Sequence, residues 1–330
     1  MPSSFLPASS GPLDTSSHTT PCQIEVEPNR RRWGALFARV PAPALTQSIA
    51  YGDAKAAVSG WEVERLVFHV GGWPVAICQV LVRRVWGLPV AARINRGPLF
   101  LAAEPAVTEI RAVYGALRRR WRFGRRGVVF LAPGLADGAL HRQCLQEAGF
   151  RPRSVAGWRS ALLDLRQPAA ELRRRLASNW RNHLNGAERN GLSFELERTP
   201  EALAWMLEHH ADHMREKGFA GTSVDFLQAL ARRAPDDVFV ARVRQAGTPL
   251  AGMILCRFGN SAEYFVGWYG TEARRAKAGH FLVWHAALAM AAVGCARFDL
   301  GGYSSSDGYG RFKQDMRGTE YTLADEWIAF

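Results

Sequence analysis

The stretch "RFDLGGYSSSDGYGRFKQDM", Arg297 to Met316, combines residues that could act on an anionic or acyl substrate. An apolar strand is expected to end at Asp299 and to continue into a Gly/Ser-rich loop, whose backbone N–H groups can approach an anion closely. Phe312 then offers a flat face for a base or ribose, and Lys313 offers a mobile charge for a phosphate or a developing oxyanion. The alternatives are a core position for Phe312 and plain surface for Lys313.

Asp299 precedes two glycines, Gly301 and Gly302. A carboxylate at such a place ties a loop by accepting backbone hydrogen bonds. We therefore assign these three residues a structural role in the loop, ahead of a direct part in the chemistry.

The elements around this loop follow a plan that occurs twice. Strand patterns with turns at "GGWP" and "WGLP" precede a helix at about 105–120, a buried strand "GVVFLAP" and a helix in "HRQCLQEAGF". Strands recur in "DVFVARVRQAGTPLAGMILCRFGNSAEYFVGWYG", where "GTPLA" matches the earlier "GWPVA". Two copies of one mixed α/β domain explain this order, although a chance similarity between hairpins remains an alternative.

A basic helix is expected between the copies. An apolar stripe there consists of Leu172, Leu176, Trp180, Leu184 and Ala187 at helical spacing. Arginines 173, 174, 175, 181 and 189 occupy the opposite faces, and Gly191 is expected as the C-cap. The basic side is either a solvated surface or a surface that faces phosphates.

Size and composition set the limits for these interpretations. The chain has 330 residues, a length typical of two domains, and 48% of them are hydrophobic. Its net charge of +12 favours a polyanionic partner, although a GC-rich genome that uses Arg freely gives the same excess. The five Cys are scattered, and neither a signal peptide nor an apolar run of membrane-spanning length is present. We expect a cytoplasmic protein with a disordered tail at residues 1–32.

Three segments resemble Fem-type (FemABX) peptidyltransferases, which are GNAT-like aminoacyltransferases. They are "LTQSIAYGDAK", "SNWRNHLNGAERNGLSFE" and "GCARFDLGGYSSSDGYGRFKQDM", and they occur in the family's order within residues 44–330. The resemblance implies two tandem GNAT-like domains, each a mixed, mostly antiparallel sheet flanked by helices. The first would cover residues 33–165, completed by a C-terminal strand at about 318–330, and the second residues 166–317.

The resemblance also implies an activity. Fem-type proteins transfer an amino acid from aminoacyl-tRNA to an amine of a peptidoglycan precursor or natural product, forming an amide bond. Neither a metal nor a cofactor is expected, and we expect a monomer. Because the ester is already activated, such an enzyme has to position the amine and stabilise the oxyanion. Lys313 is then the catalytic residue, with Phe312 beside it for the tRNA.

Further site residues follow from the same resemblance. Lys55 and Tyr264 match residues of the acceptor site, and Ser223 or Phe226 stands where the best-known members use an Arg and a Tyr that do not align here. This departure leaves the acceptor open, and the transferred amino acid is open as well. Lys55 could also be a solvated helix residue, and Tyr264 a core residue.

An acyl-CoA or acyl-carrier-protein donor is the alternative to tRNA. Residues 274–279, "RRAKAG", match the GNAT pyrophosphate loop except that Lys277 replaces a glycine. A side chain at that position would crowd a bound pyrophosphate. With Arg275, Lys277 and Arg311, this region stays basic and is assigned to donor binding. A third possibility is a non-catalytic protein that binds nucleic acid in a basic cleft.

Overall fold

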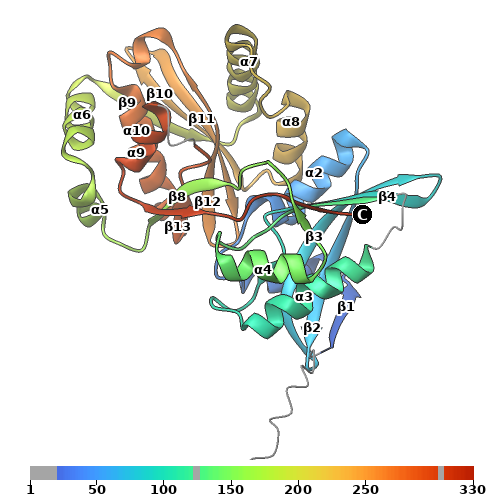
Figure 1. Cartoon of the computed structure of the whole chain (residues 1–330). Helices are drawn as coiled ribbons and strands as arrows, with labels where there is room; N and C mark the ends of the chain where they lie inside the picture. Colours follow the sequence, from blue (N-terminus) through green and yellow to red (C-terminus); the bar gives the residue numbers. More distant parts are fainter. Residues whose placement is uncertain (1–20, 122–126, 304–307) are drawn as a thin grey trace, which may run out of the picture.

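The computed structural model describes residues 21–121, 127–303 and 308–330, and its strands form two mixed sheets flanked by helices (Figure 1). The predicted α/β fold class is confirmed. In spatial order, the first sheet contains β1 (Cys22–Val26), β2 (Glu62–Val70), β3 (Trp73–Val85), β4 (Leu88–Asn95), β6 (Val128–Ala132), β15 (Trp327–Ala329) and β7 (Arg151–Pro152), with β5 (Leu99–Phe100) paired to β3. The second contains β14 (Thr319–Thr322), β8 (Arg159–Asp164), β13 (Arg297–Asp299), β12 (Ser261–Tyr269), β11 (Thr248–Phe258), β10 (Val238–Gln245) and β9 (Leu192–Glu197).

Each sheet has its own apolar core on one face. The first packs against α3 (Val107–Arg120) and α4 (Ala139–Glu147). The second packs against α5 (Ala169–Arg175), α6 (Ser178–Arg189) and α9 (Ala278–Ala292). Burial of these apolar faces is the main force that holds each layer together.

A third core joins the two domains. It combines α1 (Arg30–Ala38), the 3-10 turn η1 (Leu45–Gln47) and α2 (Ile49–Ser59) with α7 (Pro200–Lys217) and α8 (Val224–Arg233). Figure 1 shows α2 against α8 at this junction. Tyr51 of the first domain and Phe226 of the second are thus buried in one continuous cluster, with their rings edge to face. In the described ranges, every helix is too short or too polar to span a membrane.

Three expected boundaries need correction. Part of the tail predicted at 1–32 is ordered, because β1 pairs with β2 and α1 begins at Arg30, while residues 1–20 lie outside the described part. β8 was placed in the first domain but pairs with β13 and β14 of the second sheet. Of the C-terminal segment, only β15 lies in the first sheet, where it pairs with β6 and β7; β14 belongs to the second.

The basic segment forms two helices where one was expected. Leu176 and Ala177 adopt extended backbone angles between α5 and α6, yet the predicted apolar stripe is buried along both helices. Asn190 is the C-cap, and Gly191 follows in the left-handed conformation that ends a helix. Arg173 binds Glu188, and Arg174 binds Glu171, so these two arginines form surface ion pairs.

The repeated Gly-x-Pro motif is a hairpin signature. The motif occurs at residues 72–76, 87–91 and 247–251. Each copy begins with the second central residue of a tight turn, and the residue after its proline forms a β-bulge. In each turn the two central residues have positive φ angles, and the second of them is glycine. Proline fits next to the bulge because the strand needs no N–H donor there. Since two of the three copies lie in the first sheet, the motif alone does not indicate a domain repeat.

Candidate active site

A cavity of about 1030 Å³ lies between the domains and is lined by six of the twelve predicted site residues. Its walls include Lys55, Ser223, Phe226, Tyr264, Gly302 and Lys313. Sequence reasoning missed several cationic and aromatic residues that line the cavity: Arg93, Arg96, Trp158, Arg159 and Tyr309. No acidic side chain is among the described residues that line it, so the cavity favours an anionic ligand.

Lys313 is buried in the wall of this cavity. It lies on the short helix α10 (Gly308–Gln314) and is only 2% exposed. Its Nζ donates hydrogen bonds to the carbonyl oxygens of Gly301 and Gly302, at 3.0 and 3.2 Å. The ammonium also lies 4.3 and 4.8 Å from the ring centroids of Tyr309 and Tyr264. Carbonyl oxygens and aromatic faces both stabilise a positive charge, so a fixed cation faces the ligand space.

Asp299 fixes the loop that carries these carbonyls. One carboxylate oxygen accepts hydrogen bonds from the backbone N–H of Gly301, at 2.9 Å, and from the hydroxyl of Ser160. The other accepts a hydrogen bond of 2.5 Å from the Tyr321 hydroxyl. Asp299 is 5% exposed, and both oxygens are engaged in holding the loop, as a structural role requires.

The two glycines of the loop allow a close approach of backbone to protein. Gly301 has a φ of +75°, and a Cβ on it would lie 2.3 Å from the carbonyl oxygen of Tyr264. A Cβ on Gly302 would lie 2.6 Å from the ring of Trp158. Side chains at either position would displace the carbonyls that hold Lys313.

The loop occupies the point where two parallel strands separate. β12 and β13 pair in parallel from Ser261 to Glu263, and β13 then ends at Asp299 while β12 continues to Tyr269. Tyr264, the first β12 residue past this pairing, lies beneath the Lys313 ammonium. Burial raises the pKa of the Tyr264 hydroxyl, which also forms a 2.9 Å hydrogen bond with the Tyr269 hydroxyl.

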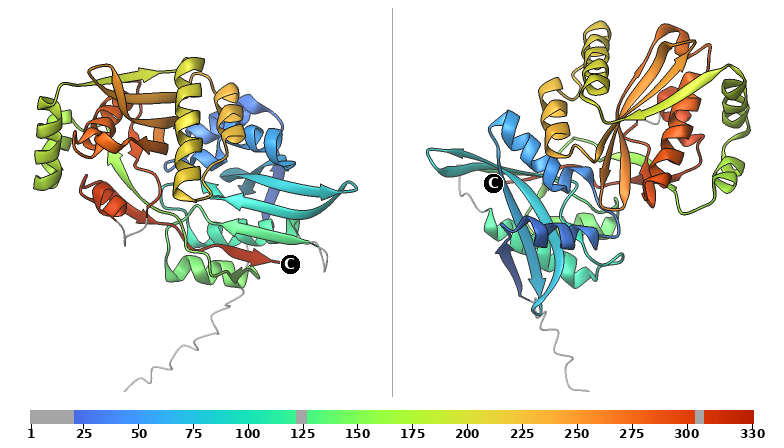
Figure 2. Two further views of the ribbon diagram at one scale, coloured as in Figure 1. Left: turned by 90° about the horizontal axis from the view of Figure 1, so that it is seen from above. Right: turned by 180° about the vertical axis from the view of Figure 1, so that it is seen from behind.

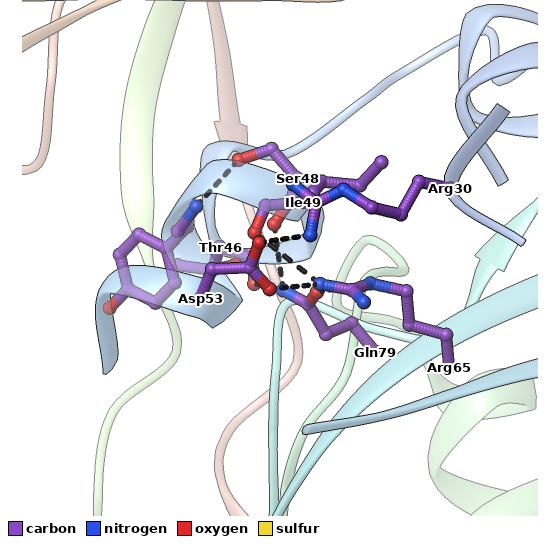
Figure 3. A network of polar contacts seen from close by, with 8 residues as sticks. Arg30, Thr46, Ser48, Ile49, Asp53, Arg65 and Gln79 are labelled. Carbon is purple, nitrogen blue, oxygen red and sulfur yellow. Dashed lines mark hydrogen bonds and ion pairs between the residues drawn. The ribbon is translucent and has the colours of Figure 1, made fainter. Parts of the chain in front are cut away.

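Helix α2 is anchored so that Lys55 faces the cavity. Figure 3 shows Asp53 of α2 paired with Arg30 and, at 2.6 Å, with Arg65 of β2. Ser48 caps the helix at the N–H of Tyr51, and its carbonyl accepts a 2.8 Å hydrogen bond from Gln79.

The rest of the "LTQSIAYGDAK" segment is built into the same framework. A Cβ on Gly52 would lie 2.4 Å from the Gln79 side chain, so the helix approaches β3 closely only with glycine there. The Gln47 side chain, fully buried, binds both backbone groups of Gln79 and the carbonyl of Asn95. The framework thus brings Lys55 to the cavity, together with Thr46 and Tyr51 of the same segment.

Lys55 lies against an aromatic wall. Its Nζ is 4.3 Å from the ring centroid of Phe226, which packs edge-on against Tyr51. Burial, followed by the positive charge of Arg93, lowers the pKa of Lys55. Because these effects disfavour its own charge, an anion between Lys55 and Arg93 would be bound favourably. Ser223 also lines the cavity, and its hydroxyl caps α8 at the N–H of Phe226.

Arg96 is a wall residue that sequence reasoning missed. It lies in the loop after β4, and its guanidinium binds the Glu263 carboxylate of β12 at 3.0 and 3.2 Å. The guanidinium carbon also stacks 3.9 Å from the Trp158 ring centroid. Burial raises the pKa of Glu263, and the charge of Arg96 acts in the opposite direction. The alternating pattern of "ARINRGP" indicates a strand but not that its arginines face a cavity.

The residues assigned to the donor do not reach this cavity. Phe312 packs on Trp180 and His280. Its ring centroid lies 5.8 Å from that of Trp180 and 5.0 Å from that of His280. Successive residues of a helix point about 100° apart, so Phe312, which is half-buried, packs against the core while Lys313 faces the cavity. Arg311 is exposed, and Arg275 forms a surface ion pair with Glu272.

Lys277 keeps the backbone shape of the glycine that it replaces. It is the N-cap of α9 and has a φ of +59°, the left-handed conformation in which glycine is favoured. At this one position the turn before α9 therefore has a backbone conformation that glycine would also adopt. His183 and His280 lie beside this turn, with their ring nitrogens 3.3 Å apart.

Comparisons with known proteins agree with this architecture. Residues 171–314 match the family described as "Acetyltransferase (GNAT) domain". No curated protein matches the chain in sequence. In structure, the chain is similar to FemX, with a TM-score of 0.74 and 14% identity over 93% of this chain and 96% of that one.

Two further solved structures share the fold over nearly their whole length. A tandem GNAT protein from the clavulanic acid biosynthesis pathway has a TM-score of 0.55 and 13% identity, covering 93% of this chain and 98% of that one. L-PGS from Bacillus licheniformis has a TM-score of 0.53 and 15% identity, covering 92% of each chain. The chain therefore has the fold of Fem-type proteins, with GNAT-like domains in tandem and a GNAT acetyltransferase match in the second.

Proposed function

We propose that this protein is an acyltransferase that moves an amino acid from aminoacyl-tRNA to the amine of an anionic acceptor. The observation that carries the proposal is the buried Lys313 ammonium in the wall of a cation-lined cavity between two GNAT-like domains. The GNAT family match and the FemX-like fold support acyl transfer. The Fem-type resemblance of the segments around Lys55 and Lys313 supports aminoacyl-tRNA as the donor.

The proposed reaction needs no nucleophile from the protein. The acceptor amine forms a bond to the ester carbonyl carbon, and the carbonyl oxygen becomes an oxyanion. Collapse of this intermediate breaks the bond between that carbon and the ribose oxygen, which takes up the proton lost by the amine through solvent or substrate. Lys313 stabilises the oxyanion, a contribution that is large in a buried site.

The cavity walls favour an acceptor that carries phosphate or carboxylate. Lys55 and Arg93 line one side, and Arg159 contributes a further cation. A peptidoglycan precursor and an acidic natural product both satisfy this chemistry. Lys55→Met is expected to raise the KM for a phosphorylated acceptor roughly tenfold, because a charge-assisted contact is lost. The exposed Lys217, changed in the same way, is the control.

An acyl-CoA donor is the second candidate. It is favoured by the turn before α9, where Lys277 has a left-handed conformation that glycine would also adopt. The protein is therefore incubated with candidate amines and either radiolabelled aminoacyl-tRNAs or radiolabelled acyl-CoA. Formation of an amide product that RNase treatment abolishes is the expected result. Product from acyl-CoA alone contradicts the tRNA proposal, and ligand binding without any product favours a nucleic-acid-binding protein.

A further inference from the structure

The hairpin between β3 and β4 extends beyond the sheet as a two-stranded arm. The first pair of β2 with β3 is Glu62 with Val82, and β4 pairs with β6 only from Ala91 onward. Within the described residues, 83–90 therefore have hairpin partners but no third strand on either side. Figures 1 and 2 show this arm projecting from the rest of the molecule.

The tip of the arm is apolar and exposed. Trp86 is 98% exposed, Leu88 69% and Val85 44%. Trp86 is also in the left-handed conformation, with a φ of 50°, which bulky residues rarely adopt. The hairpins with the same construction place Gly71 and Ala246 at this position. Turn geometry favours Asn or Gly there, so the tryptophan is not explained by the needs of the turn.

Arginines surround the base of the arm. Arg83 donates a hydrogen bond to the carbonyl of Ser59, so its charge is not offset by a carboxylate in that contact. Arg84 binds Glu62 and Glu64, and Arg120 of α3 also binds Glu64. Arg84 and Arg120 thus share two carboxylates, whereas Arg83 adds a positive charge whose partner is a backbone carbonyl, in a chain whose net charge is +12.

We propose that this arm docks the protein on an anionic membrane surface. Trp86, Leu88 and Val85 enter the headgroup region of the bilayer, and the arginines at the base remain at its charged surface. Tryptophan with nearby basic residues is typical of the membrane interface. A specific protein interface buries more than about 1,000 Å² in total, which three side chains on a narrow convex tip do not supply.

Docking in this way would place the cavity near the lipid. Leu81 and Arg93 are paired across the arm's base, and both line the cavity. Five residues of extended strand separate Leu81 from Trp86, a span of roughly 17 Å. The arm thus rises from the rim of the cavity, and its insertion would turn that rim toward the membrane. The proposal does not depend on the identity of the acyl donor.

The test is flotation of the full chain with vesicles of phosphatidylcholine alone or mixed with phosphatidylglycerol. The variant is Trp86→Asn, because Asn-Gly suits this turn and the fold is expected to keep or raise its Tm. The matched control is Trp73→Thr, which removes another exposed tryptophan, 77% exposed, at the opposite end of β3. Threonine is well tolerated in strands.

Wild-type protein is expected to float with the vesicles that contain phosphatidylglycerol, and to bind less when salt is raised. Trp86→Asn should lower the partition coefficient about tenfold or more, whereas Trp73→Thr should change it less than about twofold. Equal binding of wild type and Trp86→Asn overturns the proposal, as does failure of the wild type to bind. Self-association that depends on Trp86, measured by sedimentation velocity without lipid binding, overturns it in favour of a protein interface.

Discussion

Arg96, which lines the cavity from the first domain, holds Glu263 of the second through two hydrogen bonds, of 3.0 and 3.2 Å. The Glu263 side chain is 1% exposed and that of Arg96 11%. The pair therefore joins the domains at the site itself, and Arg96 also supports Trp158, which packs against Gly302 of the Lys313 loop.

Breaking this pair should destabilise the protein strongly. Glu263→Gln leaves the Arg96 charge buried without its counterion, and we expect a loss of about 3 kcal/mol in the free energy of unfolding. Urea denaturation measures this change. Glu272→Gln removes an exposed ion pair with Arg275 and should cost less than about 1 kcal/mol. Equal midpoints for the two variants would show that the Arg96–Glu263 pair contributes little.

Removing the buried ammonium should abolish most of the turnover. Lys313→Met keeps the length of the side chain but deletes its charge, and kcat should fall about 100-fold or more. The KM for the acceptor should change far less, because the charge acts on the transition state. Steady-state kinetics with Lys217→Met as control separates this effect from loss of surface charge. Unchanged kcat in a folded Lys313→Met protein would end the catalytic assignment.

The left-handed turn before α9 predicts opposite results for two substitutions. Lys277→Gly removes a side chain from a conformation that glycine adopts readily, so stability should stay the same or rise by up to about 1 kcal/mol. Gly301→Ala adds a Cβ at a φ of +75°, 2.3 Å from the Tyr264 carbonyl, and should lower the Tm. Calorimetry measures the Tm of both variants. A lower Tm for Lys277→Gly would contradict the proposal that the turn favours glycine at this position.

The histidine pair predicts a pH dependence of stability. Burial and the charges of His183 and Lys277 lower the pKa of His280 to about 4, from 6.5. Between these values the unfolded chain binds a proton that the folded chain does not, so stability should rise as pH increases from about 4 to about 6.5. Because burial and Lys277 also lower the pKa of His183, the two rings titrate as a pair.

Denaturation midpoints measured across this pH range test the prediction. His280→Gln should reduce the increase of the denaturation midpoint with pH. His213→Gln, on α7 and away from this pair, should leave that increase unchanged. If the midpoint of His280→Gln increases with pH as steeply as that of the wild type, another group is responsible for the pH dependence.

The fold class and six of the residues that line the cavity could be predicted because the sequence carries local signals for them. Alternating strands, paired glycines and helical spacing are short-range patterns, and the Fem-type segments align around Lys55, Tyr264 and Lys313. These residues meet in one cavity, as do Ser223 and Phe226. Asp299 and its two glycines also lie where a loop-tying role places them.

Other features depend on contacts between distant segments, which local patterns do not encode. Arg96 meets Glu263 across the domain junction. Trp158, which directly precedes β8 in a segment expected in the first domain, lies against Gly302 of the second. Phe312 was expected to face a ligand beside Lys313. Because both residues lie on a helix, their side chains diverge, and the aromatic ring packs against the core.

The placement of β15 has a consequence for biogenesis. This strand follows the entire second domain along the chain, yet it fills the gap between β6 and β7 in the first sheet. During synthesis on the ribosome, the first sheet therefore cannot be completed until the second domain has been synthesised. An N-terminal fragment expressed alone would expose the β6 edge, and a supplied peptide with the sequence of β15 should complete it.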